Sequence, residues 1–123
     1  MSLDYYDRFG KPLPDFVVFG RLFHDPAYQT VRKARVGGIR ISTVWLGLDH
    51  SFGQGPPLIF ETMVFGDRMD EEYFRYATEA EAIEGHYRMA RRVRGWRFWQ
   101  RIEDTTEAEI AHQRAFRERE RTA

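Results

Sequence analysis

Six residues in the first half of the chain have side chains suited to binding a ligand. They are Arg32, Thr43, Trp45, Asp49, His50 and Glu61. A guanidinium group binds anions through a planar fork of donors, an indole ring offers a stacking surface, and a carboxylate accepts hydrogen bonds. This combination predicts a site for an anionic small molecule or a protein partner. The alternative is that Arg32 and Glu61 form a structural ion pair under another segment or at an interface.

Catalysis is the alternative function. A small hydrolase or nucleic-acid-processing enzyme would need Asp49, His50 and Glu61 to act together. The chain has no cysteine nucleophile, no Gly-x-Ser-x-Gly motif and no His-Glu-x-x-His or comparable metal-ligand spacing. His86 lies in the apolar stripe of a predicted helix, where a hydrogen-bonded core histidine is commoner than a ligand. We therefore expect a binding protein without a catalytic residue, metal or cofactor.

Arginines and aromatic residues alternate between positions 88 and 101. The stretch contains Arg88, Arg91, Arg92, Arg94, Trp96, Arg97, Phe98, Trp99 and Arg101. Proteins that bind single strands interleave charges and rings in this way. However, acidic residues surround the stretch, the chain has 19 basic and 19 acidic side chains, and aromatic residues more often close a core. Nucleic-acid binding is therefore not the expected function.

The six candidate residues lie on or beside predicted strands. Residues 28–36 and 39–49 favour strands and are separated by Gly37-Gly38, which is typical of a two-residue hairpin turn. Residues 57–65 and 73–77 predict two further strands. A short helix is expected before them, over about residues 15–24.

Two-residue alternation divides these strands into two faces. The hairpin turn brings Arg32 near Thr43. If Asp49 lies opposite Pro57, Trp45 lies near Glu61 on the same face as these two residues. The other face is then apolar and should receive a helix; it carries Val44, Leu46, Leu48, Leu58, Phe60, Thr62 and Val64.

Two capping boxes predict helices in the second half of the chain. Residues 78–81 (TEAE) open a helix to about Arg94, which Gly95 ends, and residues 106–109 (TEAE) open one to about Arg119. The expected fold is α+β, with a small antiparallel meander of three to four strands packed on a helix. Residues 1–102 would form one domain, followed by a charged C-terminal helix or tail over residues 103–123.

Length and composition are those of one small domain. The 123 residues are 42% apolar and 31% charged. No apolar run approaches the roughly 18 residues of a membrane span, and no secretory signal is evident, so we expect a cytoplasmic protein without membrane contact. A sheet with two apolar faces and a net charge of zero predict a homo-oligomer.

Two long motifs resemble a family of short phage, prophage and actinobacterial proteins. They are residues 42–50 (STVWLGLDH) and 55–65 (GPPLIFETMVF), and the resemblance covers roughly residues 5–94. The family has no established activity, so the resemblance implies a phage-type accessory protein and no catalytic residues. By analogy with other small phage proteins, it would bind a host component in the host cytoplasm, for example as a counter-defence factor.

Overall fold

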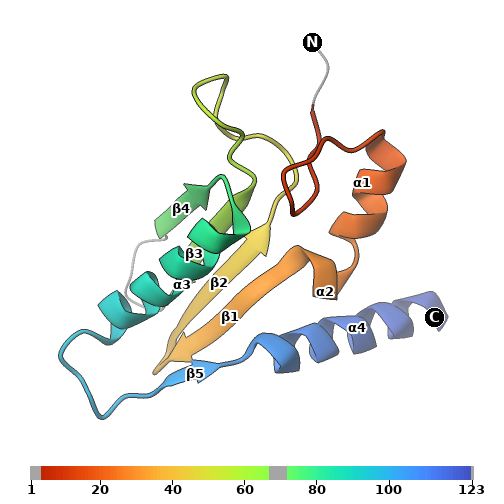
Figure 1. The fold of residues 1–123 in the computed structure, drawn as a ribbon. Coiled ribbons are helices and arrows are strands. Elements are labelled where there is room, and N and C mark those ends of the chain that lie inside the picture. Colours follow the sequence, from red (N-terminus) through yellow and green to blue (C-terminus); the bar gives the residue numbers. More distant parts are fainter. Residues whose placement is uncertain (1–3, 67–71, 123) are drawn as a thin grey trace.

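The chain folds around one antiparallel sheet. The computed structural model describes residues 4–66 and 72–122, and the strands in them stand in the order β4-β3-β2-β1-β5 (Figure 1). They are β1 (Thr30–Val36), β2 (Ile39–Trp45), β3 (Phe60–Phe65), β4 (Glu72–Tyr76) and β5 (Ile102–Asp104). The first four form the meander that the sequence predicts, and β5 is an additional strand at the edge beside β1.

Helices pack on this sheet and beside it. The described helices are α1 (Phe16–Phe23), α2 (Pro26–Gln29), α3 (Glu79–Arg94) and α4 (Thr106–Thr122). Helix α3 lies across one face of the sheet, while α4 packs along β1 and reaches α2 (Figure 1). The α+β fold expected from the sequence is confirmed. The domain boundary expected at residue 102 falls inside β5.

Helix α3 begins and ends at the residues that the sequence indicates. The hydroxyl of Thr78 accepts a hydrogen bond from the N–H of Glu81 at 3.1 Å, which satisfies a free donor of the first turn. Gly95 follows the last turn with a φ of 57°, a conformation that favours glycine. These two local signals position the helix along the chain.

Helix α4 begins differently from the expected capping box. A capping box would have the hydroxyl of Thr106 accept from the N–H of Glu109. This N–H donates instead to the carbonyl oxygen of Thr105, at 2.9 Å. The hydroxyl of Thr106 instead accepts from the N–H of Lys33 on β1 at 2.9 Å and donates to the carboxylate of Asp104 at 2.6 Å. The first turn of α4 is therefore attached to the backbone of β1.

The register between β2 and β3 differs by one residue from the expected one. Trp45 lies opposite Phe60, although a pairing of Asp49 with Pro57 would place it opposite Glu61. The cause is a bulge after Trp45, where the N–H groups of Leu46 and Gly47 both point to the carbonyl oxygen of Ile59, at 2.7 and 3.4 Å. Because the bulge adds one residue to the β2 side, the pairing expected from Asp49 and Pro57 is shifted by one residue in the strands.

This shift reverses the predicted faces of β2. Because successive side chains point to opposite faces of a sheet, a displacement of one residue moves every side chain of the strand to the other face. Thr43 and Trp45 therefore share the face covered by α3 with Phe60, while Val44 lies opposite Glu61 on the other face. The expected common face for Trp45 and Glu61 is wrong. The β1–β2 register is as expected from Val36 to Arg32, which lies opposite Thr43, and it shifts between Arg32 and Thr30.

The core lies between the sheet and α3 in two clusters. One contains Ala34, Val36, Ile41, Val64, Met89, Ala90 and Val93, and the other contains Phe19, Val31, Trp45, Ile59, Phe60 and Ala82. The second cluster is closed by α1, whose Phe19 ring lies 5.7 Å from the ring of Trp45. Helix α1 is thus fixed at one end of the sheet, where it can form a wall with neighbouring elements.

Candidate functional site

Two of the six predicted binding residues are buried in the core. Thr43 and Trp45 are both 0% exposed. The indole N–H of Trp45 donates to the carbonyl oxygen of Tyr6 at 3.1 Å, and its ring packs against aromatic neighbours. Neither side chain offers a surface to a ligand in this structure.

The hydroxyl of Thr43 belongs to a buried polar chain. It lies 2.6 Å from the hydroxyl of Thr62 and 2.8 Å from Nδ1 of His86 on α3. Burial lowers the pKa of His86 from its ordinary value to about 4, so its ring is neutral at pH 7. The interpretation of His86 as a hydrogen-bonded core histidine is confirmed.

Asp49 and His50 organise the loop between β2 and β3. The carboxylate of Asp49 accepts from the N–H and hydroxyl of Ser51, at 2.7 and 2.9 Å, and from the N–H of Leu58 at 3.0 Å. Desolvation raises the pKa of Asp49, but these hydrogen bonds together hold it below its ordinary value. The N–H of His50 donates to the carbonyl oxygen of Leu58 at 3.0 Å, which also closes the loop.

Arg32 and Glu61 have separate partners. Nε of Arg75 donates to the carboxylate of Glu61 at 3.1 Å, while the guanidinium of Arg32 donates to the carbonyl oxygen of Val31 at 2.8 Å. Hydrogen bonds from Thr106 are the main cause of a lowered pKa at Asp104, and the charge of Arg32 adds to it. The expected Arg32–Glu61 pair is therefore replaced by Arg75–Glu61, on the face opposite α3.

The structure does not bring the six residues into one site. Within residues 4–66 and 72–122, no hydrogen bond joins Asp49, His50 and Glu61, the three groups that a catalytic mechanism would need. The same ranges contain no group of three His, Cys, Asp or Glu side chains placed to hold a metal ion.

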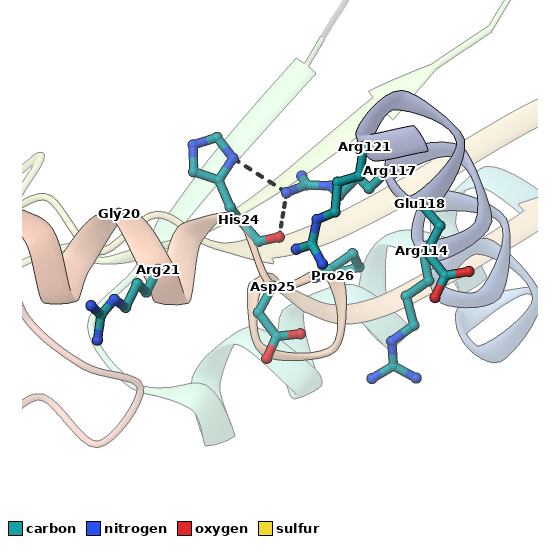
Figure 2. A pocket seen from close by; sticks show the side chains of 9 residues that line it. All are labelled: Gly20, Arg21, His24, Asp25, Pro26, Arg114, Arg117, Glu118 and Arg121. Atoms are coloured by element: carbon teal, nitrogen blue, oxygen red, sulfur yellow. Dashed lines mark hydrogen bonds between the residues drawn. The ribbon is translucent and has the colours of Figure 1, made fainter. Parts of the chain in front are cut away.

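A cavity of about 620 Å³ lies elsewhere, between α1–α2 and α4 (Figure 2). Four arginines line it, Arg21, Arg114, Arg117 and Arg121, with the carboxylates of Asp25 and Glu118. Arg21 comes from α1 and the other three from α4, on the opposite wall (Figure 2). The lining has two more arginines than carboxylates, so the cavity is suited to an anion.

Helical spacing brings the α4 side chains to the same wall. Arg114, Arg117 and Arg121 are three and four residues apart, so they project from one side of the helix. The guanidinium of Arg117 donates to the carbonyl oxygen of His24, the residue that follows α1, and its Nη1 lies 3.2 Å from Nδ1 of His24. This contact joins α4 to the end of α1 across the cavity.

Part of the acidic charge in the cavity is already engaged. The carboxylate of Asp25 accepts from the N–H of Ala27 at 3.1 Å, and this bond caps α2. The sequence did not reveal the cavity because α4 has few apolar residues, which predicts a charged helix or tail. The i, i+3, i+7 spacing of three arginines was the available signal, but it does not reveal what faces them.

Comparisons with known proteins add no further identification. No family model, curated protein or solved structure matches this chain. None of the described helices has the length and apolar character needed to cross a membrane.

Proposed function

We propose that this chain is a small non-enzymatic binding protein that takes an anionic small molecule in the cavity between α1–α2 and α4. The observation that carries the proposal is that Arg21, Arg114 and Arg121 line one cavity, across which Arg117 contacts His24. Guanidinium groups favour planar or tetrahedral oxyanions, so the ligand would carry a carboxylate or phosphate. On the sequence resemblance, we also propose a phage-type accessory role in the host cytoplasm.

The enzyme alternative has less support from the geometry. Asp49 is engaged in the loop that follows β2, and Glu61 is paired with Arg75. A binding function needs neither group to be free.

Titration calorimetry with pyrophosphate and with a nucleoside monophosphate tests the proposal. The double variant Arg114→Gln/Arg121→Gln removes two cavity charges but leaves the Arg117 contact in place. Arg119→Gln on the same helix is the matched control, because Arg119 is exposed and does not line the cavity. We expect salt-sensitive binding that is kept in the control and lost in the double variant. Equal binding by the double variant and the wild type, or no binding of either anion, would overturn the proposal.

A further inference from the structure

The loop at residues 95–101, between α3 and β5, presents three large aromatic side chains to solvent. The exposed fractions are 72% for Trp96, 80% for Phe98 and 67% for Trp99. The two indole rings lie 5.2 Å apart at an interplanar angle of 73°. None of the three residues belongs to either core cluster, so the expectation that they close a core is wrong. Such an exposed aromatic group indicates a binding surface.

Short-range hydrogen bonds give this aromatic loop a defined backbone. The N–H of Arg97 donates to the carbonyl oxygen of Arg94 at 3.1 Å, and the N–H of Gln100 donates to that of Arg97 at 3.0 Å. The loop also abuts the β1–β2 turn, since a Cβ atom at Gly37 would lie 3.3 Å from Nε2 of Gln100. The backbone that carries the rings is therefore ordered before any partner binds, which lowers the entropic cost of binding.

Arginines without carboxylate partners accompany the rings. Within the described residues, no carboxylate lies within ion-pair distance of Arg35, Arg91, Arg94, Arg97 or Arg101. Arg35 and Arg101 line a shallow cavity of about 410 Å³ beside the loop, together with Glu103. The surface thus combines stacking groups with available positive charge.

Acidic residues near positions 88–101 argue against nucleic-acid binding in the sequence. In the structure, most of them lie far from the aromatic loop or are paired with an arginine. Glu79 and Glu81 are in the first turn of α3, whereas the aromatic loop follows its last turn, about 20 Å away along the helix axis. Glu84 is paired with Arg88 at 3.2 Å, and Glu72 is paired with Arg92 at 3.4 Å. Glu103 and Asp104, in the strand that follows the loop, are acidic groups that stay close to it. The five arginines without a carboxylate partner among the described residues outnumber these two.

We propose that the aromatic loop binds single-stranded nucleic acid. Bases would stack on Trp96, Phe98 and Trp99, and the neighbouring guanidinium groups would contact phosphates. Stacking on aromatic rings needs unpaired bases and tolerates any base, so the surface would prefer single strands to duplexes and show little sequence selectivity. Arginines on β1, on α3 and in the loop itself give the charge an extent that suits a polyanion rather than a single phosphate.

Fluorescence anisotropy with a labelled oligothymidylate tests this proposal. The variant Trp96→Ala/Trp99→Ala removes two exposed rings, and Phe116→Ala is the matched control, because Phe116 is 51% exposed on α4. We expect at least about tenfold weaker binding by the double variant and unchanged binding by the control. The conservative variant Trp99→Phe should keep most of the affinity, and Arg97→Gln/Arg101→Gln should reduce the salt dependence of binding.

Three results would overturn the proposal. They are no binding at low salt, equal affinity for the matched duplex, and wild-type affinity in the Trp96→Ala/Trp99→Ala variant. Binding to vesicles that contain phosphatidylserine, with no binding of the oligothymidylate, would also overturn it and assign the rings to a membrane surface. The cavity variant Arg114→Gln/Arg121→Gln should bind the oligonucleotide normally, so this proposal and the proposed function can fail independently.

Discussion

The hydroxyl of Thr43 on β2 lies 2.8 Å from Nδ1 of His86 on α3, and both side chains are buried. The same hydroxyl lies 2.6 Å from that of Thr62 on β3. A hydroxyl has one proton to donate, so Thr43 can donate to one neighbour and accept from the other. The chain of three side chains therefore connects two strands and a helix through directional contacts, which apolar packing alone would not provide.

Stability should fall in mild acid because of His86. Its folded-state pKa is lowered to about 4 by burial, below the ordinary 6.5, so the unfolded chain binds a proton more readily between these values. We expect the free energy of unfolding to decrease by roughly 1–3 kcal/mol as the pH falls from 7 to 4. Denaturant titrations at several pH values measure this change.

The variant His86→Gln is the control for that experiment. It removes the titrating ring, so the dependence on pH between 5 and 7 should flatten. Asp49 and Asp104, whose pKa values are also lowered, add their own loss of stability only below about pH 5. An equal slope above pH 5 in the wild type and in the variant would contradict the prediction.

Replacing Thr43 by valine should destabilise the fold. Valine has a similar shape, but it leaves Nδ1 of His86 and the hydroxyl of Thr62 without their partner in a buried place. We expect a loss of about 1–3 kcal/mol in the free energy of unfolding. Thr122→Val, at an exposed position of α4, should change it by less than about 0.5 kcal/mol. Similar losses in the two variants would argue against the polar chain.

Gly47 should be intolerant of any side chain. Its φ is 78°, and a Cβ atom would lie 2.4 Å from Cε1 of Phe19. Gly53 is the matched control, because its φ is 80° and a Cβ atom there would meet nothing within 4 Å. Gly53→Ala should cost about 1–2 kcal/mol from backbone strain alone, and Gly47→Ala should cost clearly more. Thermal unfolding compares them, and equal losses would refute the predicted clash.

Self-association remains a prediction for the sheet face opposite α3. This face carries partly exposed apolar side chains, namely Val44, Met63, Phe65 and Tyr73. A second copy of the chain could cover them, and we expect light scattering to give about twice the 14.7 kDa of one chain at micromolar concentration. Tyr73→Glu should shift the mass to that of a monomer, while Phe116→Glu on α4 should not. A wild-type mass of 14.7 kDa would exclude this association.

Local signals predicted most of the elements, and longer-range relationships were missed. The glycines at 37–38 fixed the β1–β2 register, and Thr78 and Gly95 marked the ends of α3. The register of β3 failed because the bulge at Gly47 depends on Phe19 and Ile59, which are distant in sequence. Strand β5 has only three residues, too few for a visible alternation.

The candidate site was missed for a similar reason. Residue type identified groups able to bind ligands, but their availability depends on burial and on partners. Trp45 is enclosed by the core, and Glu61 is held by Arg75. The arginines of α4 form a cavity wall only through their position opposite α1, which no local pattern encodes.

The attachment of α4 to β1 has a consequence for the integrity of the sheet. Among the residues that the structure describes, strand β5 pairs with residues 34–36 of β1, so the earlier part of β1 would present open backbone groups to another chain. Thr105 and Thr106 occupy the N–H and carbonyl oxygen of Lys33 instead. The start of α4 thereby prevents another strand from pairing with this part of β1. A chain shortened before β5 would expose the unpaired backbone groups of β1, and we expect it to aggregate by strand addition.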